Sequence, residues 1–271
     1  MKHWTLDDMP WERFDRRSVD PDIVKVVKAA SMVEHNAGDY ATYLCNVFHD
    51  DPEFQEAARR WAREEVQHGR ALARWAKLAD PEFDFEASFK RFRQGFHLPL
   101  EARESVRGSR AGELIARCMV EVATSSYYMT LHDATDEPTL KEICRNIAAD
   151  ELRHYKLFYS HLKRYLEREK LGRWRRLLVA LDRITESEDD ELAYAYYAAN
   201  GGDEPYDRRR STRAYIHRVY SNYRPRHVER AVAMILKVIG FKSHGRFNLW
   251  LTKIVCWFMQ YRSQRLARAG A

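Results

Sequence analysis

Trp61-Ala62-Arg63-Glu64-Glu65-Val66-Gln67-His68 and Ile147-Ala148-Ala149-Asp150-Glu151-Leu152-Arg153-His154 are two segments of the chain that share one pattern. In each of them a Glu precedes a His by three positions, a spacing that places both side chains on one face of an α-helix. Such a pair can bind a single metal ion. One Glu-x-x-His motif occurs by chance in many helical proteins. Two of them, on separate predicted helices, indicate a metal site inside a helical bundle.

The residues around these motifs have the patterns of four long helices. Asp51-Pro52 and Pro138 mark two helix starts, because an Asp caps a helix and Pro suits its first position. Two long helices, a long crossover and two more long helices follow the order of ferritin-like bundles. The predicted spans are Asp22 to Phe48, Pro52 to Leu78, Ala102 or Arg110 to Asp133, and Pro138 to Lys170, with a short helix-like piece at Phe85 to Arg93 in the crossover.

The chain divides into three predicted parts. Residues 1–20 form an irregular N-terminal leader, and residues 21–170 form the ferritin-like four-helix bundle. Residues 171–271 are expected to form a C-terminal helical extension packed on the bundle, with helical patterns at 191–200, 228–239 and 246–265. No strand-type alternation persists in the sequence, so the predicted fold class is all-α.

The remaining two long helices each offer one Glu, as a di-iron bundle requires. Glu34 precedes Glu65, and Glu121 precedes Glu151, by nearly the same number of residues. Buried carboxylates are costly unless cations compensate them, and this set of oxygen and nitrogen donors suits iron or manganese. A single buried Glu could pair with an Arg and a single His could be a core residue, but six together favour a site for two metal ions. The predicted ligands are Glu34, Glu65, His68, Glu121, Glu151 and His154.

Longer segments resemble the soluble acyl-carrier-protein desaturases of the ferritin-like di-iron carboxylate superfamily. Trp61 to Gly69 resembles their first iron motif, and Ile143 to His154 closely resembles their second. Glu121-Val122-Ala123-Thr124 resembles a Glu-x-Ala-Thr sequence on their third helix, and Glu34 with Tyr40 to Leu44 loosely matches their first helix. The resemblance covers about residues 32–166.

This resemblance implies a non-haem di-iron oxidase that uses dioxygen to desaturate or hydroxylate an acyl or other lipid-type substrate. It also implies that Thr124 assists proton delivery, although its hydroxyl could simply bond back to a helix carbonyl. Asp150 could orient a ligand histidine or be solvated, and Trp61 could lie beside the site or belong to the core. The alternative function is iron handling by a ferroxidase or a peroxide-scavenging protein, which would share all six ligands.

The net charge of +6 suits an acidic partner. Candidates are an external electron donor such as a ferredoxin, an acyl carrier protein and an anionic membrane surface. Basic residues alternate with acidic ones, so no nucleic-acid partner is predicted. The aromatic and basic residues of 247–268 could lie on a membrane or pack as a core helix. Homodimers are common in the family that the chain resembles. The polar leader, and four cysteines whose surroundings suggest buried thiols of a reducing compartment, favour a cytoplasmic protein, possibly peripheral to the membrane.

Overall fold

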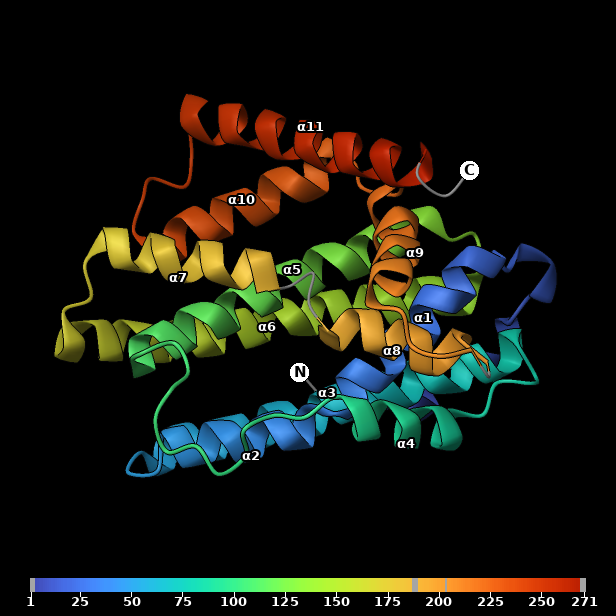
Figure 1. The fold of residues 1–271 in the computed structure, drawn as a ribbon, viewed down its shortest axis with the longest axis horizontal. Helices are drawn as coiled ribbons and strands as arrows, with labels where there is room; N and C mark the ends of the chain where they lie inside the picture. Colours follow the sequence, from blue (N-terminus) through green and yellow to red (C-terminus); the bar gives the residue numbers. More distant parts are fainter. Residues whose placement is uncertain (1–2, 187–189, 203, 269–271) are drawn as a thin grey trace.

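The computed structural model describes residues 3–186, 190–202 and 204–268, and it is helical, with no strand in these ranges. The predicted all-α class is confirmed. Figure 1 shows long helices stacked in layers, with short connections between most of them. The helices are α1 (Pro21–His35), α2 (Ala37–Val47), α3 (Pro52–Ala79), α4 (Phe85–Gly95), α5 (Arg110–Ala134), α6 (Pro138–Glu169), α7 (Arg173–Glu186), α8 (Asp190–Asn200), α9 (Arg208–Tyr220), α10 (Pro225–Ile239) and α11 (Arg246–Arg268).

Four stretches of helix form the centre of the molecule. Helices α5 and α6 pack side by side, α1 and α2 pack in succession against α3, and α3 also contacts α6 (Figure 1). Their facing sides bury large apolar residues, among them Trp75, Leu114 and Phe158, which are inaccessible to solvent. Burial of this kind is the main favourable contribution to folding.

Capped turns position both helices that carry a Glu-x-x-His motif. The Asp51 carboxylate accepts a hydrogen bond from the Phe54 backbone N–H at the start of α3. At the start of α6 the Glu137 carboxylate accepts one from Leu140 N at 2.7 Å. The same carboxylate accepts a hydrogen bond of 2.6 Å from the Trp75 indole of α3. The Glu137 carboxylate therefore caps the N-terminus of α6 and also joins α6 to α3 by a hydrogen bond.

The first predicted helix differs from the structure, because Asn36 interrupts it. Helix α1 ends at His35 and α2 begins at Ala37, while Asn36 takes a non-helical conformation. Asn and the nearby Gly38 have low helix propensity, which makes this position a favourable one for a break. Opposite the break, a Cβ on Gly69 of α3 would lie only 2.6 Å from His35 N. Glycine at position 69 thus lets α3 approach the end of α1 closely.

The remaining elements surround this centre. Three short 3-10 helices, Leu6–Asp8, Trp11–Arg13 and Arg16–Ser18, lead into α1, and the first two contact α3 and α6. Helix α8 packs against α1, α7 and α10 pack against α5, and α11 packs against α10 and α9. Across the described ranges, none of the helices has both the length and the apolar content that crossing a bilayer demands.

Candidate metal centre

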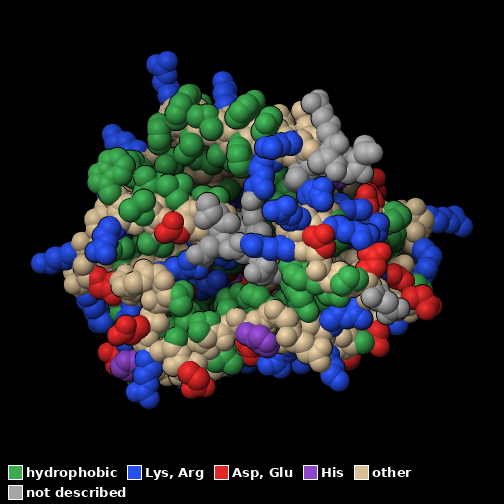
Figure 2. All heavy atoms as spheres, viewed as in Figure 1, with side chains coloured by type: hydrophobic (Ala, Val, Ile, Leu, Met, Phe, Trp, Pro, Cys, Tyr) green, Lys and Arg blue, Asp and Glu red, His purple; other side chains and the backbone are tan. Residues whose placement is uncertain are grey.

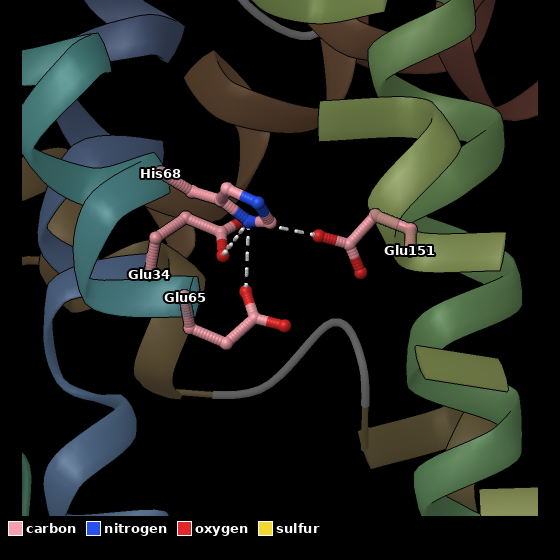
Figure 3. Close-up of side chains that lie close together, drawn as sticks. All are labelled: Glu34, Glu65, His68 and Glu151. Atoms are coloured by element: carbon pink, nitrogen blue, oxygen red, sulfur yellow. Dashed lines mark hydrogen bonds and ion pairs between the residues drawn. The ribbon is translucent and has the colours of Figure 1, made fainter. Parts of the chain in front are cut away.

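The six residues predicted as ligands lie together among helices α1, α3, α5 and α6. They form two groups: Glu34, Glu65, His68 and Glu151, and then Glu65, Glu121, Glu151 and His154. Within each group one potential ligand atom per residue lies within 4.8 Å of the others, and every residue is buried. Figure 3 shows the first group, with Glu34, Glu65 and Glu151 directed towards His68. Because Glu65 and Glu151 belong to both groups, the two groups adjoin one another.

Both histidines present the same ring nitrogen to the carboxylates. His68 Nδ1 lies 3.2 Å from Glu65 Oε2 and 3.3 Å from Glu151 Oε1, with Glu34 Oε2 at 3.8 Å. His154 Nδ1 lies 2.8 Å from Glu65 Oε1, with Glu121 Oε2 at 3.6 Å. The arrangement is nearly symmetric, since His68 of α3 lies against Glu151 of α6 and His154 of α6 lies against Glu65 of α3.

The opposite nitrogen of each histidine faces an acid from the other motif helix. His68 Nε2 of α3 lies 3.0 Å from Asp150 Oδ2 of α6, and His154 Nε2 of α6 lies 2.8 Å from Glu64 Oε2 of α3. An N–H at Nε2 can donate to the acid, which leaves the Nδ1 lone pair directed at the carboxylates. The structure thus places Asp150 against a predicted ligand histidine. The matching role of Glu64 was missed, although an acid stands before the Glu in both motifs.

The leader also reaches the site, which the sequence analysis did not predict. The Trp4 indole donates a hydrogen bond of 2.7 Å to Asp150 Oδ2, and its ring stacks on His68 with centroids 5.8 Å apart. His3 Nε2 lies 2.8 Å from the same oxygen. No spacing rule links Trp4 to Asp150, because only the folded chain brings the leader to α6.

Two hydroxyls touch the carboxylates. The Tyr128 hydroxyl donates to Glu34 Oε1 at 2.5 Å. Thr124 Oγ1 lies 2.7 Å from Glu151 Oε2 and 3.1 Å from the Val120 carbonyl. Its single proton can therefore go to the Glu151 carboxylate or back to the helix carbonyl. Tyr128 was not singled out from the sequence.

Trp61 lies one helical turn before Glu65 and is buried. Its ring meets Phe158 edge-on with centroids 5.4 Å apart and lies beside the Arg117 guanidinium. No hydrogen bond joins its indole nitrogen to another part of the described chain. The structure therefore places Trp61 beside Arg117, and in the described chain no hydrogen bond or ring contact joins it to the six residues.

Burial and mutual charge shift the acid–base properties of the group. Burial raises the pKa of Glu34 and of Glu121 well above the usual range of a carboxyl, and neighbouring carboxylates add to the effect. Burial acts in the same direction on Glu65, but hydrogen bonds and the charge of His154 outweigh it and lower its pKa. Burial alone would lower the pKa of His68, yet the surrounding carboxylates raise it. Burial and mutual charge therefore favour the protonated forms of Glu34, Glu121 and His68 in the site as it stands, without a metal.

Whether a metal fits the site depends on its buried atoms, and several of them lack a hydrogen-bond partner in the described structure. They are Glu65 Oε1, both carboxylate oxygens of Glu121, Glu151 Oε1 and His154 Nδ1. The 2.8 Å contact between His154 Nδ1 and Glu65 Oε1 does not have hydrogen-bond geometry. Unpartnered buried polar atoms are costly, whereas lone pairs that converge from several sides are what a cation requires. The donor set of carboxylates and imidazoles fits iron or manganese.

Comparison with known proteins agrees with this geometry. No curated protein matches the chain. A family model described as fatty acid desaturase matches residues 21–175, which include all six of the clustered residues and more than half of the sequence. The chain therefore belongs to the fatty acid desaturase family.

Proposed function

We propose that the protein is a dioxygen-dependent di-iron oxidoreductase that desaturates or hydroxylates an acyl or lipid-type substrate. The family contributes the reaction class, since fatty acid desaturases oxidise lipid chains. The observation that carries the metal assignment is that the two groups share Glu65 and Glu151. Shared carboxylates suit a pair of bridged ions, because one carboxylate can offer an oxygen to each metal. The proposed fold is the ferritin-like bundle of α1–α2, α3, α5 and α6, as in soluble acyl-carrier-protein desaturases.

The residues of the chain would hold the metals and keep the site dry. Glu34, His68, Glu121 and His154 would each bind one ion, and Glu65 and Glu151 would bridge the two. Two iron ions would supply the activation of dioxygen and the oxidising power for a C–H bond. Asp150 and Glu64 would fix the two histidine tautomers. Thr124 would hold or release a proton at Glu151 Oε2, and Tyr128 would hold Glu34 in position.

Electrons must reach such a site from outside, because the sequence has neither a Cys-x-x-Cys pair nor a Gly-rich nucleotide motif. We propose an external donor such as a ferredoxin, which is acidic and complements the net charge of +6. An acyl carrier protein is a further proposed partner, and a homodimer is the proposed assembly. Both follow from the resemblance to soluble desaturases.

A single-turnover experiment tests the proposed function. The purified protein is loaded with ferrous iron under anaerobic conditions and mixed with dioxygen, and iron bound and dioxygen consumed are measured per chain. The oxidase proposal expects about two irons per chain and dioxygen uptake that speeds up with an acyl substrate. Oxidation of many irons per chain without an organic substrate would instead support the iron-handling alternative. A protein that binds no iron would contradict both.

Replacing Thr124 with Val is expected to slow dioxygen consumption by about a hundredfold while the iron content stays unchanged. General acid–base groups typically contribute at least this much, and Val keeps the shape but removes the proton. Thr124→Ser retains a hydroxyl and serves as the control. If the Val variant reacts at the wild-type rate with full iron, the hydroxyl only bonds back to the Val120 carbonyl.

Replacing Asp150 with Asn is expected to weaken iron binding by about 10- to 100-fold, the usual effect of losing the partner of a ligand histidine. Burial opposes ionisation of Asp150, but the bonds from His68 and Arg153 outweigh it and hold its pKa well below the usual range. The Asp therefore stays ionised and offers His68 a charged acceptor. Competition with a chelator measures the affinity, and the exposed Asp136→Asn is the control. Equal affinities for both variants would contradict the proposed role.

Helices α7 and α11 expose large apolar side chains, which a helix packed in the core would bury. Figure 2 shows hydrophobic side chains gathered on the viewed face over these two helices. Between residues 246 and 265 helix α11 carries four basic residues and no acidic one. Two copies of such a surface would repel each other, whereas an anionic bilayer would attract it. The exposed residues are Trp174, Leu178, Leu181, Ile184, Phe247, Leu249, Trp250, Ile254, Trp257, Phe258 and Tyr261.

We therefore propose that this face lies on an anionic membrane surface. The protein should sediment with phosphatidylglycerol vesicles and much less with phosphatidylcholine vesicles. A Trp250→Ser/Trp257→Ser double variant should bind the phosphatidylglycerol vesicles at least about tenfold more weakly, because it lacks two indoles that would be buried in the interface. Val106→Ser, at an exposed apolar residue in the crossover, is the control. Equal sedimentation of all three proteins with both vesicles would contradict the proposal.

A further inference from the structure

An arginine lies inside the bundle, on the same face of α5 as Glu121. Arg117 precedes Glu121 by one helical turn, and only 6% of it is exposed. Its guanidinium carbon lies 4.8 Å from the centre of the Tyr40 ring of α2 and 5.8 Å from that of Trp61 of α3. The aromatic faces stabilise a cation there. They do not satisfy the hydrogen-bond donors of the guanidinium.

The polar groups around Arg117 are incompletely paired in the described structure. Arg117 Nε, Trp61 Nε1 and Glu191 Oε1 are buried without a hydrogen-bond partner. Within the described ranges no carboxylate oxygen lies within 4.0 Å of the Arg117 guanidinium nitrogens. Glu113, one turn earlier on α5, is instead bonded by the Tyr43 hydroxyl at 2.8 Å. A buried guanidinium without a direct ion pair is unusual, because Arg is almost always paired when it is buried.

The surroundings of Arg117 add positive charge. Burial and the neighbouring Arg117 both lower the pKa of the half-buried Arg183 of α7, so these two cations lie close enough to repel each other. One acid, Glu191, lies near both arginines and accepts a hydrogen bond of 2.7 Å at Oε2 from the Tyr40 hydroxyl. Burial raises its pKa although that bond and the charges of Arg183 and Arg117 oppose the shift, so it is a weakened anionic neighbour of the two cations. Figure 2 shows further Lys and Arg side chains at the surface near the end of α7 and the start of α8. An anion bound at Arg117 would complete this arrangement.

We propose that Arg117 binds the carboxylate of the substrate inside the bundle, one turn of α5 away from Glu121. The proposal rests on the proposed function, since Glu121 marks the end where oxidation would occur. A planar guanidinium matches a carboxylate with two parallel hydrogen bonds, and the nearby Trp61 indole N–H offers another donor. Four residues of helix rise about 6 Å, so Arg117 and Glu121 leave α5 one turn apart, and a short carbon chain suits the space between the carboxylate and the metal ligands. The substrate class is therefore a compact free carboxylic acid. This proposal replaces the carrier-bound substrate considered under the proposed function, because a thioester would present no anion to Arg117.

Octanoate and its uncharged analogue octanamide test the proposal on the purified protein, kept anaerobic so that nothing turns over. Calorimetry should show octanoate binding at least about tenfold tighter than octanamide, the effect of one charge-assisted interaction. Arg117→Gln should abolish this preference while leaving octanamide binding unchanged. Arg117→Lys keeps the charge but loses the paired N–H donors of the guanidinium, so its preference for octanoate should be intermediate. Arg60→Gln, at an exposed position of α3, should behave as the wild type.

Thermal unfolding separates a binding role from a structural one. Without a ligand, the cost of burying the Arg117 charge offsets the stabilisation that the aromatic rings provide. Arg117→Gln should therefore unfold at the wild-type temperature or above. Octanoate should raise the unfolding temperature of the wild type and not that of the variant. Equal binding of octanoate and octanamide to the wild type, or full octanoate preference in Arg117→Gln, would overturn the proposal.

The two proposals can fail separately. A protein that prefers octanoate through Arg117 but neither binds two irons nor consumes dioxygen would retain the carboxylate site and lose the proposed oxidase function. A protein that binds two irons and consumes dioxygen, but does not distinguish the acid from the amide, would retain the oxidase function and overturn the carboxylate site.

Discussion

Replacing Glu151 with Gln is expected to reduce bound iron from about two ions to less than one per chain and to abolish dioxygen consumption. Glu151 belongs to both groups of clustered residues, so the loss of one carboxylate affects both proposed metal positions. Gln has nearly the same shape but lacks the charge, and its amide nitrogen cannot ligate a cation. The loss of affinity should exceed the roughly 10- to 100-fold effect of removing a partner of a ligand.

A comparison among the carboxylates makes this expectation specific. Glu34 belongs only to the first group and Glu121 only to the second, whereas Glu65 is shared like Glu151. Glu34→Gln and Glu121→Gln should therefore each retain more iron than Glu65→Gln or Glu151→Gln. Iron analysis after gel filtration measures this order, and the exposed Glu167→Gln of α6 is the matched control. Two irons per chain in Glu151→Gln would refute the bridging assignment.

The sequence was sufficient to predict what depends on local periodicity. The two Glu-x-x-His motifs impose their geometry through helical spacing alone, so the pairing of Glu65 with His68 and of Glu151 with His154 follows from position i and i+3. The starts of α3 and α6 followed from Asp51-Pro52 and Pro138, because caps and first-turn prolines are local signals. The all-α class followed for the same reason.

Contacts between distant parts of the chain could not be predicted in this way. The bond from Trp4 to Asp150 depends on how the leader crosses α6, and the crosswise pair of Glu64 with His154 depends on how α3 and α6 align. The break at Asn36 reflects weak propensities that a continuous apolar pattern concealed. Arg117 was overlooked because a single Arg in a helix usually faces solvent, and only tertiary packing shows that this one is buried.

Metal removal is expected to destabilise the protein more at high pH than at low pH. In the metal-free site the pKa values of Glu34, Glu121, His68 and His154 are all raised, by burial for the two acids and by carboxylates that outweigh burial for the two histidines. A group whose pKa is raised in the folded state contributes stability below its unfolded pKa and loses it as the pH rises through the folded value. The metal-free protein should therefore lose stability from about pH 5 to about pH 8.

The other two carboxylates do not cancel this trend. The pKa values of Glu65 and Glu151 are lowered, since hydrogen bonds and histidine charge outweigh burial at Glu65 and nearby histidines do so at Glu151. Their contribution is present above the unfolded pKa of a carboxyl and is lost only as the pH falls through their folded values. Above about pH 5 the contributions of Glu65 and Glu151 to stability are constant. The groups with raised pKa values therefore determine how stability changes with pH.

Bound cations should reverse the effect, because they bind ionised carboxylates and neutral imidazoles and compete with protons. We expect chelation to lower the unfolding temperature by on the order of 5 °C or more at pH 8 and by clearly less at pH 5.5. Differential scanning calorimetry with and without chelator measures both values. In the metal-free protein Glu121→Gln should flatten the pH dependence, since it removes one carboxylate that must ionise in a buried position. An effect of chelation that is equal at the two pH values, or larger at pH 5.5, would show that protons do not occupy the place of the metals.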